Sequence, residues 1–247
     1  MRICLSDLNE LDKKEPQLFS LGCVVDTNAL FAASVPIDRL NEWTEEVLAE
    51  VGALKIPIFS NINVRSEFLE MQRRVLVPEG LVSFYDQTNR ETLNSHLKMQ
   101  LVRLKSRKDK AGKEERIFKL GDKEIKAFRD LFRDEVGIEA WEYFCADFLH
   151  PYLVPAWEEL VTEFKIHFLG TRNIEAGGYF ETPPRWNDMV ELMGKFGIGA
   201  ADAMIVNFFM SSKFPLIVTG DEDVAFVVEK LSNGKKYVLV PDKISWN

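Results

Sequence analysis

Short apolar runs alternate with longer amphipathic stretches along most of this chain. Apolar residues at steps of three and four predict helices over residues 38–54, 186–196 and 199–212. The apolar runs themselves are typical of buried strands. They lie at 21–26, 55–59, 166–169, 215–219 and 236–240. Strands separated by helices predict an α/β fold with a mainly parallel sheet and helical crossovers.

A further helix is predicted directly after the second apolar run. Ser60 or Asn61 can cap its start, because side-chain oxygens of these residues accept hydrogen bonds from the first helical N–H groups. Pro78 and Gly80 predict that it ends near Val77.

The middle of the chain has a different pattern. Residues 81–134 are polar, basic and helical in character, with a break near 108–115, and residues 135–165 are aromatic-rich and helical. We expect these aromatic side chains to form core contacts, and we expect a loop over 171–184. The chain is therefore predicted to be a single domain, 1–247, whose core segments, about 20–79 and 165–247, flank a helical insertion of about 80–164.

Composition narrows the classes of protein. No stretch approaches 18 apolar residues, so we expect no membrane span, and the charged start of the chain does not resemble a signal peptide. The three cysteines are scattered and fit neither a disulfide framework nor a zinc motif. We therefore expect a cytoplasmic protein. A homodimer or an inhibitor protein remains open as a partner.

The net charge of −8 conceals a strong asymmetry. Residues 98–133 hold thirteen Lys or Arg and six Asp or Glu, a net of +7. Such a segment predicts a nucleic-acid-binding surface, and a solvated helical face is the alternative. Its densest cationic part consists of Lys105, Arg107, Lys108, Lys110 and Lys113.

Two predicted strands end in acids. Asp26 follows "CVV", while Asp221 and Asp223 follow "LIVTG". A single aspartate at such a place is readily a turn or a helix cap. Ligands of open α/β sheets, however, bind at the carboxyl ends of the strands, where these acids are expected to meet.

Two more acids lie on apolar helix faces. Glu67 is flanked by Val64 and Phe68, and Asp202 begins a helix that is otherwise almost entirely apolar. Stabilisation of the helix dipole is the alternative for Asp202. Like charges about 4 Å apart repel by roughly 4 kcal/mol at an effective dielectric near 20. A cluster of carboxylates without His or Cys therefore predicts a bound hard cation, Mg²⁺ or Mn²⁺.

The acids lie in four motifs that together resemble the PIN domain family of metal-dependent ribonucleases. These are "VVDTNAL", "FSNINVRSEFLE", "FGIGAADAMIVNFF" and "LIVTGDEDVAF", over about 140 of the 247 residues. The resemblance implies a three-layer α/β/α fold and hydrolysis of RNA with Mg²⁺ or Mn²⁺. It also implies roles for individual residues: metal ligands at Asp26, Glu67, Asp202 and Asp221, with Asp223 holding a metal or its water, and supporting positions at Asn28, Ser60 and Thr219.

One departure limits the resemblance. Glu67 and Asp202 are 135 positions apart, farther than in compact PIN domains, so the substrates of short toxins of this family are not carried over. A non-catalytic RNA- or protein-binding module is the alternative function. A phosphatase with an aspartate nucleophile would need an acid at position 28, which is Asn28.

Overall fold

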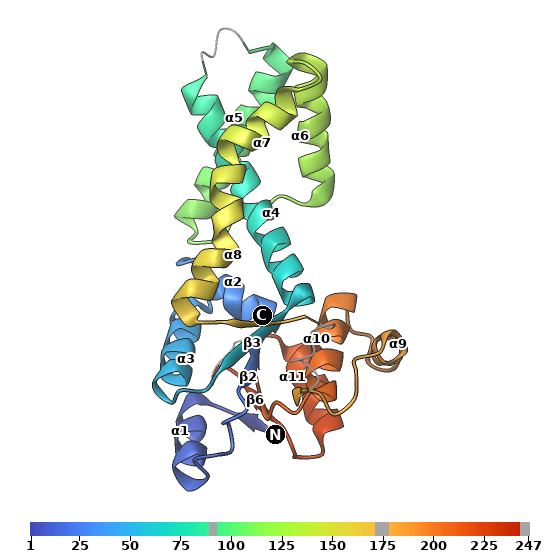
Figure 1. The fold of residues 1–247 in the computed structure, drawn as a ribbon. Coiled ribbons are helices and arrows are strands. Elements are labelled where there is room, and N and C mark those ends of the chain that lie inside the picture. Colours follow the sequence, from blue (N-terminus) through green and yellow to red (C-terminus); the bar gives the residue numbers. More distant parts are fainter. Residues whose placement is uncertain (89–92, 171–177, 243–247) are drawn as a thin grey trace. The chain divides into compact units, whose positions relative to one another are not determined.

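A computed structural model describes residues 1–88, 93–170 and 178–242 of the chain (Figure 1). The chain divides into two compact units. Unit 1 comprises Met1–Phe68 and Leu160–Asn247, and unit 2 comprises Leu69–Glu159. Most of the loop predicted over 171–184, namely 171–177, lies outside the described residues. Unit 2 overlaps the predicted insertion of 80–164.

Unit 1 contains one six-stranded sheet in which every pairing is parallel, as predicted. The strand order is β1-β6-β5-β2-β3-β4. The strands are β1 (Arg2–Ile3), β2 (Cys23–Val25), β3 (Ile58–Asn61), β4 (His167–Leu169), β5 (Leu216–Val218) and β6 (Tyr237–Leu239). All residues of β2, β3 and β5 are buried, which explains why these strands lack a polar face.

Two local features differ from prediction. The edge strand β1 and the helix α1 (Leu5–Lys14) were not predicted, because two strand residues show no periodicity and pair only with β6. Strand β3 begins three residues later than the predicted 55–59. Lys55 has a positive φ of 58°, which places it in the turn that follows the preceding helix rather than in a strand.

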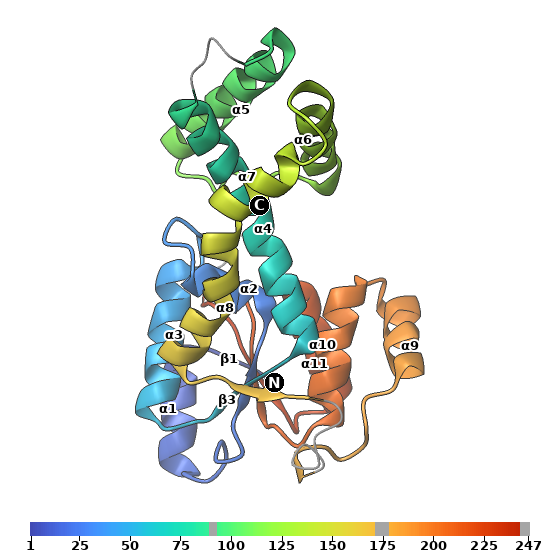
Figure 2. The same cartoon turned by 45° about the horizontal axis from the view of Figure 1, so that its top comes forward.

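Helices cover both faces of the sheet. In Figures 1 and 2, α1 and α3 (Asn41–Ala53) lie on one side of the strands, and α10 (Ala200–Ser211) and α11 (Glu222–Ser232) lie on the other. Helix α9 (Trp186–Phe196) packs beside α10, and α2 (Thr27–Ala33) packs beside α3. The result is an α/β fold whose layers are compatible with an α/β/α sandwich.

The strand order contains a switch point between β2 and β5. From β2 the chain crosses to β3 on one side, whereas from β5 it crosses to β6 on the opposite side. In an open parallel sheet, the crevice that binds ligands lies outside the carboxyl ends of the two strands at such a reversal. Asp26 directly follows β2 and Thr219 directly follows β5, so the topology brings the two positions together.

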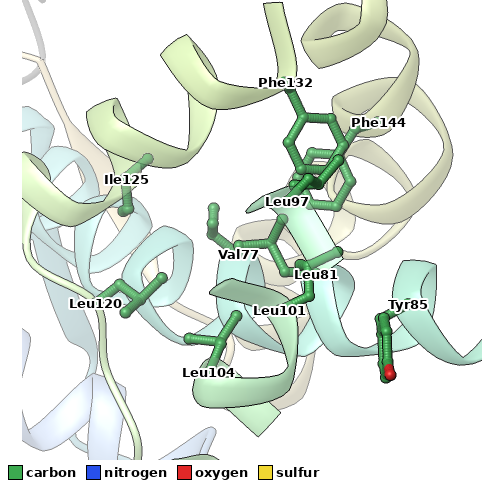
Figure 3. Close-up of a cluster of buried hydrophobic side chains, with 10 residues drawn as sticks. All are labelled: Val77, Leu81, Tyr85, Leu97, Leu101, Leu104, Leu120, Ile125, Phe132 and Phe144. Atoms are coloured by element: carbon green, nitrogen blue, oxygen red, sulfur yellow. The ribbon is translucent and has the colours of Figure 1, made fainter. Parts of the chain in front are cut away.

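Unit 2 is helical, as predicted. It contains most of α4 (Ile62–Gln87), then α5 (Ser95–Lys113), α6 (Asp122–Glu135), α7 (Ala140–Phe148) and the first part of α8 (His150–Phe164). Figure 3 shows its separate hydrophobic core, where Leu81, Leu101 and Phe132 are fully buried together with Phe144. The expectation that aromatic residues of this segment form core contacts is confirmed there. Within the described residues, no helix combines the length and the apolar character that membrane crossing requires.

The predicted end of α4 near Val77 is wrong. Pro78 lies inside the helix, which continues to Gln87. A proline removes one backbone hydrogen bond and usually ends or kinks a helix. Here Val77, Leu81 and Tyr85 follow each other at steps of four and are buried in the core of unit 2, so packing outweighs the lost hydrogen bond.

Gly80 marks a close helix contact rather than a helix end. A Cβ atom at this position would lie 3.0 Å from the Cβ of Phe148 and 3.1 Å from its carbonyl oxygen. The absence of a side chain therefore lets α4 approach the end of α7 closely.

We expect Gly80→Leu to destabilise the protein by about 1–3 kcal/mol, because the added side chain overpacks this contact. Gly112→Leu in α5 is the matched control. A Cβ there would meet nothing within 4 Å, so higher helix propensity should leave stability unchanged or slightly increased. Denaturant unfolding measures both, and equal stability of the two variants would contradict the packing role of Gly80.

Candidate functional site

The buried carboxylate of Asp26 is at the centre of the switch point. Asp26 is the residue before α2, and its backbone N–H donates to the carbonyl of Val218 at 2.9 Å. Its Oδ1 accepts a hydrogen bond from the N–H of Thr27 at 2.7 Å. The capping role considered from sequence is therefore real, but this capping side chain is only 5% exposed.

Two further donors reach the other oxygen of Asp26. The Thr219 hydroxyl donates to Oδ2 at 2.7 Å, and the Asn28 amide donates to the same atom at 3.1 Å. The Asn28 carbonyl oxygen in turn accepts from the N–H of Gly220 at 2.9 Å. Both predicted supporting residues thus contact Asp26, and they tie the end of β2 to the end of β5.

Asp221 is joined to the same network. Its N–H donates to the Thr219 hydroxyl at 2.9 Å, so this hydroxyl bridges the two acidic positions. Asp221 also caps α11, because its Oδ1 accepts from the N–H of Asp223 at 2.8 Å. The adjacent acids thus differ in position: Asp221 belongs to the network of Asp26, and Asp223 begins the helix.

Glu67 is fixed by a residue whose function the sequence analysis did not anticipate. The buried Thr27 donates its hydroxyl to Glu67 Oε2 at 2.8 Å, across 40 positions of sequence. The signal was present, since Thr27 lies between Asp26 and Asn28, but a threonine in a turn motif does not reveal which helix it will face.

The neighbouring acid Glu70 provides a contrast. Its carboxylate bonds to Arg73 at 2.7 Å and to Arg74 at 2.9 Å, and Arg73 is the main cause that lowers the pKa of Glu70 to about 2. The predicted ion pair between Glu70 and Arg74 is confirmed. Glu70 is therefore explained by salt bridges, whereas Glu67 is held by a neutral hydroxyl.

Asp202 is half-buried in the first turn of α10. Burial raises its pKa, and the charges of Asp221, Glu67 and Asp223 raise it further, in that order. A hydrogen bond from the backbone of Gly199 opposes this rise. Asp202 therefore lies close enough to the other acids to sense their charge, which dipole stabilisation alone does not explain.

The pKa of Asp26 is also raised, to about 7. Burial is the largest cause, the hydrogen bond from Thr219 opposes it, and the charges of Glu67 and Asp221 add to it. The structure thus brings all five predicted acids into one electrostatic environment. Among residues 1–88, 93–170 and 178–242, no three His, Cys, Asp or Glu side chains are yet arranged to hold a metal ion together.

Ser60 does not join this network. It lies in β3 with its side chain buried, and its hydroxyl has no hydrogen-bond partner within the described residues. The predicted helix cap is Asn61 instead, because Asn61 Oδ1 accepts from the N–H of Asn63 at 2.9 Å and of Val64 at 3.1 Å.

The predicted basic residues are in unit 2, on α5, and most of them face carboxylates of that unit. Lys105 bonds to Asp86 at 2.6 Å, Arg107 to Glu124 at 2.8 Å, Lys108 to Glu79 at 2.8 Å, and Lys110 approaches Glu114 at 4.0 Å. Lys105, Lys110 and Lys113 line an open hollow of about 550 Å³. Exposed ion pairs of this kind are weak, so they reduce the local charge without preventing phosphate contacts.

Comparison with protein-family models, with curated proteins and with solved structures gives no match to this chain. The assignment of the site therefore depends on the residues and contacts of the chain itself.

The raised pKa of Asp26 has a consequence for the stability of the metal-free protein. Between about pH 4 and pH 7 the folded chain holds a proton that the unfolded chain releases, so Asp26 lowers the free energy of unfolding as the pH rises through this window. We expect Asp26→Asn to gain stability relative to the wild type across the window, by on the order of 1 kcal/mol or more.

Urea unfolding in the presence of a chelator, at pH 5 and at pH 8, measures this effect. Asp12→Asn, in α1 and outside the network, is the matched control and should follow the wild type at both values. A difference between Asp26→Asn and the wild type that is the same at both pH values would contradict the burial of a strained carboxylate.

Proposed function

We propose that the chain is a PIN-like nuclease that hydrolyses phosphodiester bonds of RNA with Mg²⁺ or Mn²⁺. The observation that carries this proposal is the carboxylate network at the switch point. Asp26 is buried there, is held by three donors, and lies within the electrostatic reach of Glu67 and Asp221. Acids gathered in this way at the ligand-binding edge of a sheet favour a functional role over a structural one.

The donor set suits a hard divalent cation. Carboxylate oxygens are the ligands that Mg²⁺ and Mn²⁺ prefer, and a cation would relieve the repulsion that raises the pKa values of Asp26 and Asp202. Asp26, Glu67, Asp202 and Asp221 would hold the ion, and Asp223 would hold the ion or its water. When bound, the ion supplies a water of lowered pKa and neutralises charge on the phosphate.

The neutral side chains of the network have orienting functions in this proposal. The three donors to Asp26 occupy three of its roughly four lone-pair positions, which leaves one direction for a ligand. Thr27 orients Glu67 by the same principle. Hydrogen bonds that fix the orientation of ligating carboxylates usually contribute strongly to metal affinity.

The decisive experiment is a Mn²⁺ titration with labelled RNA and DNA. We expect metal-dependent cleavage of RNA that leaves a 5′-phosphate and a 3′-hydroxyl. Asp26→Asn should abolish cleavage, and Thr219→Val should reduce it by roughly 10- to 100-fold, because it removes the donor that orients Asp26.

Asp12→Asn is the control and should cleave like the wild type. Cleavage that persists unaltered in Asp26→Asn would refute the site. RNA binding without cleavage at any metal concentration would favour the alternative, a non-catalytic binding module.

The basic residues of α5 generate a separate prediction. The acidic site repels phosphates, so we expect Lys110 and Lys113 to contribute electrostatic attraction, together with Lys105. Replacing Lys110 and Lys113 with Gln should weaken RNA binding and reduce the salt slope by about 1. Lys13→Gln with Lys14→Gln, in α1, is the charge-matched control. Equal salt slopes in the two double variants would reject the assignment.

A further inference from the structure

Unit 1 contains a small hollow that the proposed chemistry does not use. It measures about 180 Å³ and lies where the start of α4, the segment before α9 and one face of α10 meet. This volume is below that of a typical drug-sized pocket and suits one planar ring system. Its lining includes Asn61, Arg185, Trp186, Met204, Asn207 and Phe208.

Trp186 is the most informative residue of this hollow. The sequence analysis placed it in the apolar period of 186–196, but its side chain is 66% exposed, while Met189, one turn later, is buried and packs the helix. An exposed indole beside an apolar hollow formed by Met204 and Phe208 offers a stacking surface.

Asn61 contributes an unused hydrogen-bond donor. Its residue is 2% exposed, and its Oδ1 is committed to capping α4. Its amide nitrogen is buried and has no hydrogen-bond partner within the described residues. A buried donor left unpaired is unfavourable, so a ligand with a carbonyl or ring-nitrogen acceptor would be stabilised at this position.

Arg185 adds positive charge at a fixed place on the rim. Its carbonyl oxygen accepts a hydrogen bond from the Asn207 amide at 2.9 Å, and Ser211 donates to the other end of that amide at 3.3 Å. These bonds attach the start of α9 to α10. An aromatic face, an arginine and an amide donor are the groups that bind a nucleobase and its phosphate.

The hollow and the acids share two helices. Asn63, on the wall of the hollow, lies one turn before Glu67 on α4, and Met204 follows Asp202 by two residues on α10. Both views of the fold show the start of α4 beside α10 (Figures 1 and 2). A nucleic-acid strand that places a phosphate at the acids therefore has a neighbouring nucleotide within reach of the hollow.

We propose that this hollow binds one unstacked base of a single-stranded RNA next to the phosphate that is cleaved. The proposal rests on the proposed function and adds a preference for single strands. A base inside a duplex is stacked and paired, so it cannot present its face to Trp186 or its edge to Asn61 without being extruded.

Anisotropy measurements with fluorescein-labelled oligo(U) and oligo(A) octamers, and with an RNA duplex, test the proposal. The octamers are bound to the full chain carrying Asp26→Asn, so that cleavage does not interfere. Adding Trp186→Ala should weaken octamer binding by roughly 5- to 100-fold, the contribution of one stacked base, and leave duplex binding unchanged. Trp186→Phe should retain most of the affinity.

Two further variants separate recognition from folding. Val190→Ala lies one turn after Trp186 on α9, is also exposed, and should bind like the parent. Asn61→Ser keeps an oxygen that can cap α4 but removes the amide donor, so it should weaken octamer binding without lowering the melting temperature substantially.

The outcomes distinguish this inference from the proposed function. If Asp26→Asn abolishes cleavage by the otherwise unchanged chain and Trp186→Ala does not alter octamer binding, the base site is overturned and the nuclease stands. If Trp186→Ala weakens octamers and duplex equally, the base site is also overturned. If octamer binding depends on Trp186 and no nucleic acid is cleaved, the base site stands and the nuclease fails.

Discussion

The arrangement of unit 1 around β2 and β5 depends on one electrostatic constraint, a carboxylate buried where water cannot solvate it. Asp26 is nearly inaccessible and adjoins other acids, so its ionised form is unfavourable in the protein alone. Hydrogen bonds from Thr27, Asn28 and Thr219 compensate for part of this burial. The same bonds connect the ends of the two strands, so the network that accommodates the charge also fixes the geometry of the sheet edge.

This constraint explains why the site is acidic, polar and rigid at once. Thr219 donates to Asp26 and accepts from the N–H of Asp221, and Thr27 caps nothing but holds Glu67. Each hydroxyl therefore fixes a carboxylate without neutralising it. A salt bridge would have neutralised the charge, as Arg73 does for Glu70. Uncompensated charge is unfavourable for folding, and its retention here favours a function that needs a cation.

The two units are stabilised by separate cores. Unit 1 is formed by the sheet and its flanking helices, and unit 2 has its own cluster around Leu81, Leu101 and Phe132. The acids and the Trp186 hollow belong to unit 1, and the basic face of α5 belongs to unit 2. The charge asymmetry of the sequence thus corresponds to a division of the structure: acidic chemistry is placed in one unit and positive charge in the other.

The sequence by itself determined the parallel sheet, the helical middle segment and the order of the acids, because apolar runs and helical periods are local signals. It also indicated Asn61 as a cap and Glu67 as an unexplained acid. Only the tertiary structure decided that α4 passes through Pro78, that Thr27 faces Glu67, and that Trp186 remains exposed. Each of these depends on contacts between positions far apart in the chain, such as the 193 residues that separate Asp26 from Thr219. Packing energy of that kind has no signature in a local pattern, since it exists only when the distant segments meet.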